Sequence, residues 1–390
     1  MQNLIYLSAC VADLKHRARQ RIPRFAFDYI EEGCNAGDAL VNNRQSLSQV
    51  ALRPDYLSAY HQPTLTTRLM GQRYAAPLGI APLGLSGLIW PDASAMHARA
   101  AKVANIPFVL STVSTMSIEE AGDYAQDNFW FQLYPPSDDA MLRDLLHRAK
   151  QAGCQNLVVT VDVPSSSRRI KAIKSGLSVP PRITAANVLQ AALRPAWSWA
   201  TVKHGLPQFA NMRPYMTGDL SSMDSAAEFM RLHFRRVVDA DLVQQIRKQW
   251  QGNLIIKGIC HLADAQQAVA LGADGIIVSN HGGRQLDAGL SPVQTLAEIS
   301  HQLAQKTCVM ADSGVESGVD VGRYLALGAE AVFAGRPFLY GVAAHGEAGA
   351  THTIDLLLAE LEQLMSQLHC SDPLRMHEHF IGKHELAKLG

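Results

Sequence analysis

Short apolar runs rich in β-branched residues recur along the chain, and each is followed by Gly, Pro, Ser or Asp. They are continuous rather than alternating, which is typical of strands buried on both faces of a parallel sheet. The runs are residues 77–82, 108–112, 129–134, 157–162, 254–258, 275–280, 308–314 and 331–337. Segments with apolar residues at helical spacing lie between most of them. These segments are residues 92–104, 117–124, 138–152, 262–271, 292–305 and 318–327.

Eight strand-then-helix units predict a (β/α)8 barrel, the TIM-barrel architecture of the α/β class. A doubly wound sheet is the structural alternative, but such a sheet seldom contains eight units. The units follow one another regularly except after the fourth strand, where residues 163–241 form a long insertion. We expect one domain over residues 1–390, with an N-terminal helical lead-in at residues 1–75 and a C-terminal helical tail at residues 350–390.

Composition and charge narrow the classes of function. The chain has 390 residues, of which 47 % are hydrophobic, so it can bury a large core. Its 35 Lys and Arg residues balance 35 Asp and Glu residues. A nucleic-acid-binding protein usually shows a basic excess, so no nucleic-acid partner is expected.

The cysteines and the N-terminus suggest a location. The six cysteines are scattered, with no C-x-x-C pair and no zinc-type spacing. We therefore expect structural thiols in a reducing compartment and no metal site. Residues 1–20 contain a short apolar patch with no basic residue before it, which predicts neither a signal peptide nor a membrane span. A cytoplasmic location follows as an expectation.

Polar residues suited to chemistry stand where the predicted strands end. In a barrel, the active site forms at the C-terminal ends of the strands. Such residues follow six of the eight strands, which makes chance placement a weak explanation. They are Gln132, Tyr134, Thr160, Asp162, Lys257, His281, Asp312, Ser313, Gly314, Gly335 and Arg336.

The motifs around these residues resemble the FMN-dependent 2-hydroxy acid oxidase and dehydrogenase family, which includes glycolate oxidase, lactate dehydrogenase and mandelate dehydrogenase. The resemblance spans nearly the whole chain, and SNHGGRQLD at residues 279–287 is its most specific element. IAPLGLSGLIWP and LSTVSTMSIEE look most similar to the mandelate and lactate dehydrogenase branch. Further matching stretches are FDYIEEG, FQLY, TVDVP, IIKGI, DSGVESGVDVGRYLALGAEAV and GRPFLYG.

The resemblance implies a proton acceptor and a site for a carboxylate. His281 would be the base, since imidazole titrates near working pH, and Asp162 would stabilise the imidazolium. Whether His281 removes the hydroxyl proton or the α-proton first is left open. Tyr134 would contact the substrate oxygen. The substrate carboxylate would pair with the residues Tyr29, Arg169 and Arg284.

The same resemblance implies FMN as the cofactor. Lys257 would lie near the flavin ring, where reduction builds negative charge, and a lysine inside an apolar strand is costly to bury unpaired. The FMN phosphate would lie by the loops after the last two strands. The residues that match cofactor-contacting positions are Pro82, Leu83, Gly84, Ser111, Gln132, Thr160, Lys257, Ser279, Asp312, Ser313, Gly314, Gly335 and Arg336.

One position departs from the family at the phosphate end. An arginine is usual two residues after Gly314, and this chain has Glu316. A carboxylate there would repel a phosphate unless it points outward. Weaker FMN binding is one expectation, and compensation by Arg336 and Arg323 is the other.

Other departures concern the space beside the flavin and the loop before Arg169. Val113 stands where glycolate oxidases have tryptophan, and Gly84 stands where many oxidases have alanine. Both changes are expected to open space, which implies a substrate bulkier than glycolate. Ser167 and Ile170 replace a usual glycine and a usual acidic residue, so the loop geometry is expected to differ.

The inserted loop has the composition of a membrane-binding segment. No acidic residue lies between Asp162 and Asp219, whereas eight Lys and Arg residues and several aromatic residues do. Residues 184–193 form an expected N-capped amphipathic helix. A basic amphipathic segment suits an anionic membrane surface, so residues 184–215 predict peripheral contact with the inner face of the cytoplasmic membrane. The alternative is a mobile lid whose tryptophans pack on the barrel.

The sequence thus predicts an FMN enzyme that oxidises an (S)-2-hydroxy acid, lactate-like or mandelate-like, to the 2-oxo acid. A dehydrogenase that passes electrons to a quinone or respiratory acceptor is favoured over an oxidase that uses O2 and releases H2O2. Two less favoured functions stay open: a barrel without FMN that acts as a binding or scaffold protein, and a different FMN barrel chemistry such as an isomerase. The resemblance also implies a homotetramer.

Overall fold

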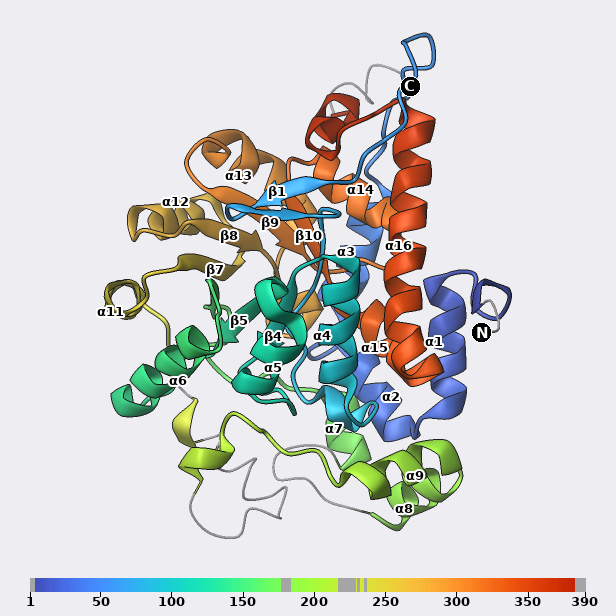
Figure 1. The fold of residues 1–390 in the computed structure, drawn as a ribbon, viewed down its shortest axis with the longest axis vertical. Coiled ribbons are helices and arrows are strands. Elements are labelled where there is room, and N and C mark those ends of the chain that lie inside the picture. The colour runs from blue at the N-terminus through green and yellow to red at the C-terminus, as the bar shows by residue number, and fades with distance from the viewer. Residues whose placement is uncertain (1–3, 177–183, 217–228, 230–231, 235–236, 383–390) are drawn as a thin grey trace.

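The computed structural model describes residues 4–176, 184–216, 229, 232–234 and 237–382 (Figure 1). Its centre is a closed barrel of eight parallel strands in the order β10-β3-β4-β5-β6-β7-β8-β9. Helices surround the barrel, so the predicted (β/α)8 architecture is confirmed. The strands are β3 (Leu78–Ile80), β4 (Phe108–Ser111), β5 (Phe129–Leu133), β6 (Asn156–Thr160), β7 (Asn253–Ile259), β8 (Gly275–Val278), β9 (Cys308–Asp312) and β10 (Ala331–Ala334).

A helix follows each strand, and the apolar spacing predicted six of these helices. Ser117 and Glu120 form a reciprocal capping box at the start of one of them, which explains where that helix begins. The helices are α4 (Ala93–Ala104), α5 (Ile118–Ala125), α6 (Asp139–Gln151), α11 (Ala240–Gln249), α12 (Leu262–Ala270), α13 (Leu296–Leu303), α14 (Gly318–Ala326), α15 (Arg336–His345) and α16 (Glu347–Leu368). The six predicted helices are α4, α5, α6, α12, α13 and α14.

Two successive sets of side chains fill the inside of the barrel. The first set is apolar and buried, and it comprises Val109, Trp130, Val158, Ile255, Ile277 and Met310. Because side chains on one face of a strand recur every second residue, the residues two positions further on face the same interior. That second set is polar and buried, and it comprises Ser111, Gln132, Thr160, Lys257, Ser279 and Asp312. The barrel interior therefore changes from apolar to polar toward the C-terminal ends of its strands.

A β-hairpin closes the apolar end of the barrel. Strands β1 (Thr67–Leu69) and β2 (Gln72–Tyr74) pair antiparallel, and Leu69 and Tyr74 are buried in the interior apolar cluster. The indole Nε1 of Trp130 donates to the hydroxyl oxygen of Tyr74 over 2.9 Å. The expected helical lead-in is therefore wrong for residues 67–74. These residues pair as two short strands, and each strand places a side chain in the barrel interior.

The rest of the N-terminal segment is helical and packs beside the C-terminal helices. Its helices are α1 (Val11–Arg21), α2 (Arg24–Glu31) and α3 (Asp38–Ser48). Helix α1 lies against α15 and close to the long helix α16 (Figure 1). The final 3-10 helix is η7 (Pro373–His379), and the last residues of the expected C-terminal tail, 383–390, lie outside the described residues.

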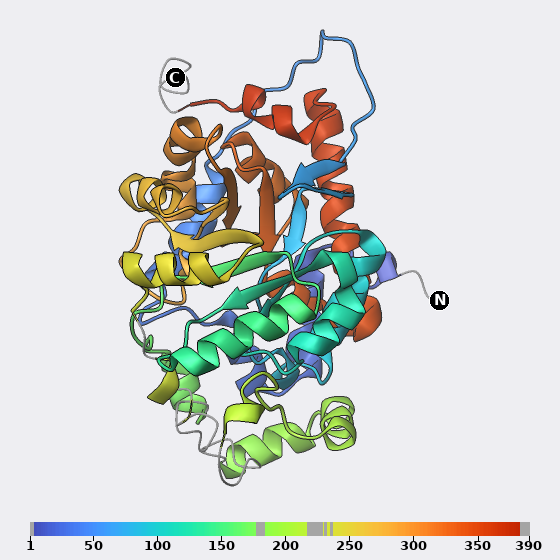
Figure 2. The ribbon, with the colours of Figure 1, turned by 60° about the vertical axis from the view of Figure 1, so that its left-hand side comes forward.

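The insertion after β6 forms a separate helical group. Its helices are α7 (Ile170–Ser175), α8 (Ala185–Ala192) and α9 (Pro195–His204), followed by the 3-10 helix η4 (Arg213–Tyr215). Thr184 caps α8 by accepting a hydrogen bond from the N–H of Asn187, as predicted. Figures 1 and 2 both place α8 and α9 outside the ring of barrel helices, at the opposite end of the molecule from the C-terminus. Residues 177–183 and 217–228 of the expected insertion lie outside the described residues.

The hairpin plug generates a prediction about stability. The substitution Tyr74→Phe removes the acceptor for the buried Trp130 N–H, and an unsatisfied buried donor costs about 1–3 kcal/mol. We expect the free energy of unfolding in urea to fall by that amount. Tyr56→Phe, at an exposed tyrosine, is the matched control and should leave the unfolding midpoint unchanged. An unchanged midpoint for Tyr74→Phe would contradict the structural role of this hydrogen bond.

Candidate active site

The site is built on a left-handed turn directly after β8, the 3-10 helix η5 (His281–Gly283). Its residues have φ angles of +58° at His281, +64° at Gly282 and +73° at Gly283. A left-handed conformation costs a non-glycine residue roughly 1–2 kcal/mol, so only His281 is strained. A Cβ at Gly283 would lie 2.6 Å from the backbone nitrogen of Leu40. The two glycines of SNHGGRQLD are therefore required by conformation and, at Gly283, by close packing.

Side-chain oxygens from three positions hold this turn by its backbone. The N–H of His281 donates to Ser279 Oγ over 3.0 Å. The N–H of Gly282 donates to Ser313 Oγ over 2.9 Å, and the N–H of Gly283 donates to Asn280 Oδ1 over 3.1 Å. Three consecutive donors are thus satisfied, which offsets the strain at His281 and fixes the direction of its side chain.

The imidazole of His281 lies between an acid and a phenol. Its Nδ1 is 3.1 Å and 3.2 Å from the two carboxylate oxygens of Asp162, which follows β6. Its Nε2 is 3.3 Å from the hydroxyl of Tyr134, which follows β5. With a proton on Nδ1 directed to Asp162, Nε2 is left as the nitrogen that can accept a proton.

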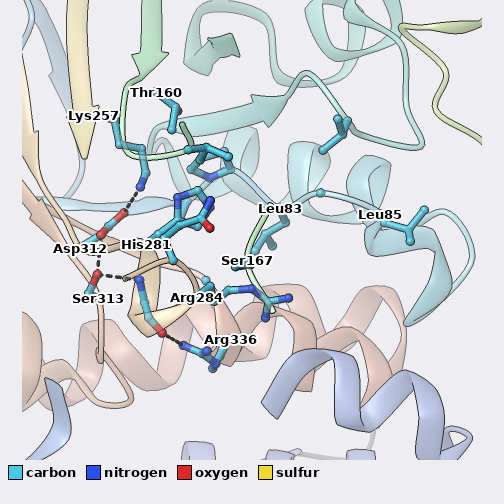
Figure 3. Close-up of a pocket in the computed structure, with 18 of the residues that line it drawn as sticks. Leu83, Leu85, Thr160, Ser167, Lys257, His281, Arg284, Asp312, Ser313 and Arg336 are labelled. Carbon is cyan, nitrogen blue, oxygen red and sulfur yellow. Dashed lines mark hydrogen bonds and ion pairs between the residues drawn. The ribbon is translucent and has the colours of Figure 1, made fainter. Parts of the chain in front are cut away.

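The charges beneath His281 are paired. Lys257 is buried in the barrel wall, where its Nζ lies 3.0 Å from Asp312 Oδ2 (Figure 3). Its Nζ also donates to Ser279 Oγ over 2.8 Å. Burial alone would lower the pKa of Lys257, but Asp312 and then Asp162 raise it. Burial alone would raise the pKa of Asp162, but His281 and Lys257 lower it. Lys257 and Asp162 therefore both remain charged near neutral pH.

Two arginines and a tyrosine form the neighbouring corner of the site. The guanidinium of Arg284 lies 4.9 Å from the ring centre of Tyr29, and that of Arg169 lies 5.9 Å from it. Arg284 Nη1 donates to the carbonyl of Tyr29 over 3.0 Å. Desolvation, followed by repulsion from Arg169, lowers the pKa of Arg284 to about 9. Like charges held this close favour an anion between them.

These groups open into one cavity of about 770 Å³. It is lined by most of the residues predicted from the sequence, namely Tyr29, Pro82, Leu83, Gly84, Tyr134, Thr160, Arg169, Lys257, His281, Arg284, Asp312, Ser313, Gly314, Gly335 and Arg336. Ser111, Gln132, Asp162 and Ser279 are not among the lining residues. Asp162 contacts the lining residue His281, and the other three are buried at the ends of their strands. The cavity thus unites residues at or after the ends of all eight strands with Tyr29 from the N-terminal segment.

Unpartnered polar atoms in this wall suit a cofactor with polar edges such as FMN. Both side-chain polar atoms of Gln132 and the hydroxyl of Thr160 are buried without a hydrogen-bond partner among the described residues. Leaving a buried polar atom unpaired costs about 1–3 kcal/mol, so such atoms are expected to meet a ligand. The residues present therefore fit FMN. No group of His, Cys, Asp and Glu side chains in the described part of the chain is placed to hold a metal ion.

The phosphate end of the cavity differs from the sequence-based expectation. All three side-chain nitrogens of Arg336 donate to backbone carbonyls, those of Ile30, Gly282 and Glu32. Figure 3 draws one of these bonds. Arg323 donates to Asp320 and does not line the cavity. Compensation by Arg323 is therefore not supported, since Arg323 lies outside the cavity wall. Arg336 lines the cavity, but three of its five N–H groups already donate to backbone carbonyls.

Sequence reasoning missed Arg44, which lines the cavity from α3 and lies 3.6 Å from Glu316. It also missed Phe234 and Val238, which line the cavity from the end of the insertion. None of the three follows a barrel strand, so the strand-end pattern could not reveal them.

Gly84 does not open space in the way expected. A Cβ at Gly84 would lie 2.7 Å from Cγ2 of Val113, so the valine already fills the position that an alanine methyl would take. Gly84 and Val113 are therefore a packed pair, and alanine at position 84 would require the Val113 side chain to shift. The extra space beside the flavin that the sequence implied therefore comes from the valine at position 113 and not from Gly84.

Comparison with known proteins identifies the family. Residues 18–383 match the FMN-dependent dehydrogenase family, and the chain belongs to it. The chain is 40 % identical over 367 residues to the L-lactate dehydrogenase of Caulobacter vibrioides (strain NA1000 / CB15N), with 94 % of this chain and 95 % of the relative covered. It is 36 % identical over 362 residues to the (S)-mandelate dehydrogenase of Pseudomonas putida, with 93 % and 91 % covered. The family resemblance and the FMN cofactor inferred from the motifs are thereby confirmed.

Solved structures agree with this placement. The crystal structure of the monotopic membrane protein (S)-mandelate dehydrogenase superimposes with a TM-score of 0.91 at 35 % identity, covering 98 % of this chain and all of that one (100 %). A crystal structure of mandelate oxidase superimposes with a TM-score of 0.81 at 31 % identity, covering 95 % and 97 %. Both dehydrogenases and oxidases therefore share this fold.

The arginine corner generates a prediction about pH. Surroundings that lower the pKa of Arg284 act on any cation there, and a lysine starts from a pKa of only about 10.4. A lowered pKa means that charge is lost as pH rises, so Arg284→Lys should lose its charge in mildly alkaline solution. We expect the KM of this variant for a carboxylate substrate to rise at least tenfold from pH 7 to 9, while the wild-type KM changes little.

The control is Arg169→Lys, at a position that is only partly buried. Its KM should rise less steeply over the same pH range, because solvent supports the ammonium. Parallel pH profiles for Arg284→Lys and the wild-type protein would contradict the argument.

Proposed function

We propose that this protein oxidises an (S)-2-hydroxy acid to the corresponding 2-oxo acid. The observation that supports this most is the arrangement of His281, with Nδ1 against Asp162 and Nε2 beside a cavity corner that holds two arginines. A 2-hydroxy acid needs a cation for its carboxylate and a base for a proton on or near the adjacent carbon, and this corner supplies both. The L-lactate and (S)-mandelate dehydrogenase relatives act on molecules of this class by name.

The carboxylate would lie between Arg169 and Arg284. Bound there, the anion would offset the repulsion that lowers the pKa of Arg284. Arginine's planar group can make two parallel hydrogen bonds to a carboxylate, which fixes the orientation of the molecule as well as its position. Tyr29 would complete this subsite, because its ring lies against both guanidinium groups.

The proton would pass to Nε2 of His281. The carboxylate of Asp162 would stabilise the imidazolium that forms, and its lowered pKa keeps it ionised for that purpose. Burial raises the pKa of Tyr134, so its hydroxyl keeps its proton and can donate to the substrate oxygen. Accordingly we assign His281, Asp162, Arg284 and Tyr134 to the reaction and Tyr29 and Arg169 to substrate binding.

FMN would be held by the polar set at the end of the barrel. When bound, FMN accepts the two electrons that the hydroxy acid loses. Gln132 and Thr160 would satisfy their unpaired atoms on it, and the positive charge of Lys257 would lie near the ring. The other proposed contacts are Pro82, Leu83, Gly84, Ser111, Ser279, Asp312, Ser313, Gly314, Gly335 and Arg336.

The cavity wall supports a substrate larger than glycolate. Val113, Val163, Phe209, Phe234 and Val238 line the cavity and are apolar. Burying an apolar substituent against such side chains contributes about 25 cal/mol per Å². A branched or aromatic 2-hydroxy acid would gain more from this wall than glycolate would.

The electron acceptor is proposed to be a quinone or another respiratory carrier, as in a dehydrogenase. The oligomer is proposed to be a homotetramer. An oxidase that reduces O2 to H2O2 is the second candidate, and the structural likeness to mandelate oxidase favours keeping it.

The test uses FMN-loaded protein with (S)-lactate and (S)-mandelate, and the (R)-isomers as controls. We expect 2-oxo acid from the (S)-isomers with a quinone analogue present and little peroxide in air. Peroxide formed in step with 2-oxo acid would favour the oxidase, and absence of 2-oxo acid from all (S)-acids would overturn the proposed function.

Membrane contact through α8 and α9 is part of the proposal. Val188, Leu189 and Leu193 on or just after α8, and Trp199 and Val202 on α9, are each more than half exposed. Exposed apolar groups gathered on adjacent helices indicate a surface that meets a partner or a membrane. The (S)-mandelate dehydrogenase of similar structure is described as a monotopic membrane protein. Across the described residues, no helix is both long and apolar enough to cross a bilayer.

The aromatic residues expected to make this contact divide into two groups. Trp199 is 73 % exposed and remains a candidate. Trp197 is buried against Phe25 and donates to the carbonyl of Leu88, so the expectation that it meets the membrane is wrong. Phe209 lines the cavity, and Tyr215 bonds to Arg148 and Asp144, so these two side chains also face the barrel.

A vesicle experiment tests the membrane surface. We expect the protein to sediment with phosphatidylglycerol vesicles at low salt, and Leu189→Ser combined with Trp199→Ser to reduce the bound fraction at least fivefold. The reduction follows from lost apolar burial, so activity toward a soluble substrate should persist. Val103→Ser, at an exposed valine on α4, is the control and should bind as the wild type does. Wild-type protein that stays in the supernatant would contradict membrane contact.

A further inference from the structure

The phosphate end of the cavity has lost one of the two arginines that the family resemblance implies there. Glu316 occupies the place of the usual arginine, and three of the five N–H groups of Arg336 are directed to backbone carbonyls. Backbone N–H groups bind a phosphate without neutralising its charge, whereas a guanidinium adds a full positive charge and paired hydrogen bonds. Another cation is therefore needed for tight binding of a phosphate dianion.

Arg44 of α3 is placed to meet this need. It lines the same cavity as Gly314, Val315 and Glu316. Its Nη1 donates to the carbonyl of Gly314 and lies 2.6 Å from Asp320 Oδ2, and its Nε lies 3.6 Å from Glu316 Oε2. Its Nη2 has no hydrogen-bond partner among the residues that the structure describes. A partly exposed guanidinium at this place thus keeps donor capacity for a ligand.

The position of Arg44 is fixed by the catalytic loop itself. Asp287, the last residue of SNHGGRQLD, accepts hydrogen bonds from the backbone of Ala36, Gly37 and Ala39 at the start of α3. Asn43, the neighbour of Arg44, exchanges two amide hydrogen bonds of 2.8 Å and 2.7 Å with Asn280. Helix α3 is therefore bound to the same loop that carries His281.

We propose that Arg44 binds the FMN phosphate together with Arg336, in place of the arginine missing at position 316, and that Glu316 weakens the hold of Arg44 on the phosphate. This inference rests on FMN occupying the cavity as proposed above. A phosphate monoester carries about −1.5 to −2 charges at neutral pH, so it competes for Arg44 with the Glu316 carboxylate. Asp320 is already shared between Arg44 and Arg323. Glu316 is therefore the carboxylate that competes with the phosphate for Arg44.

The test compares FMN with riboflavin, which lacks the phosphate. Apoprotein is titrated with each flavin, and quenching of flavin fluorescence gives the two Kd values. The ratio of the riboflavin Kd to the FMN Kd measures the contribution of the phosphate. We expect Arg44→Gln to lower this ratio at least tenfold by weakening FMN alone. We expect Glu316→Gln to raise the ratio at least threefold by strengthening FMN alone.

A matched pair of controls lies elsewhere on the surface. Arg99 and Glu347 form a similar ion pair between α4 and α16, and neither lines the cavity. Arg99→Gln and Glu347→Gln make the same charge changes and should leave the ratio unchanged. In the Arg44→Gln variant, Arg323 still donates to the buried carboxylate of Asp320. Thermal unfolding of the variant reports whether the fold is retained.

The outcomes separate this inference from the proposed function. If FMN binds and Arg44→Gln changes both Kd values equally or changes neither, Arg44 does not bind the phosphate. Glu316→Gln decides independently if Arg44→Gln does not fold, since an unchanged or lowered ratio would overturn the role given to Glu316. If wild-type apoprotein binds neither flavin, both this inference and the proposed function are overturned.

Discussion

The left-handed turn His281–Gly283 is the constraint on which the site depends, because it directs the imidazole away from β8 and toward Asp162. Its three N–H groups are held by oxygens of Ser279, Ser313 and Asn280. Those oxygens are themselves fixed, since Ser279 accepts from Lys257 and Ser313 donates to Asp312. The buried Lys257–Asp312 pair thus joins strands β7 and β9 to the turn that follows β8.

This network also explains how distant parts of the chain form one site. The turn packs on α3 through Gly283 and Leu40, and Asp287 holds the start of the same helix. Tyr29 from α2 lies against Arg284. The N-terminal helices therefore complete the substrate corner and the phosphate end, while the barrel strands supply the base and the flavin-facing polar set. Disorder in α3 would therefore perturb both the substrate corner and the phosphate end of the cavity.

The barrel and most of the cavity wall could be predicted from the sequence, because strand ends are read directly from apolar runs and their following polar residues. His281 and Asp162 are brought together because parallel strands of one barrel end at one face. Arg44 could not be predicted in this way, since a helix in the lead-in has no strand register to place it. The bonds of Arg336 to three backbone carbonyls and the contact of Gly84 with Val113 depend on tertiary packing that no local pattern records.

The central claim is that His281 accepts a proton from a 2-hydroxy acid held by two arginines. The most direct measurement is the rate at which flavin absorbance at its visible maximum is lost when FMN-loaded protein is mixed anaerobically with (S)-mandelate. A positioned general base contributes roughly 10²–10⁴ in rate. We predict that His281→Gln slows the loss of flavin absorbance by at least a hundredfold while the FMN Kd stays unchanged. A rate within tenfold of the wild type would contradict it.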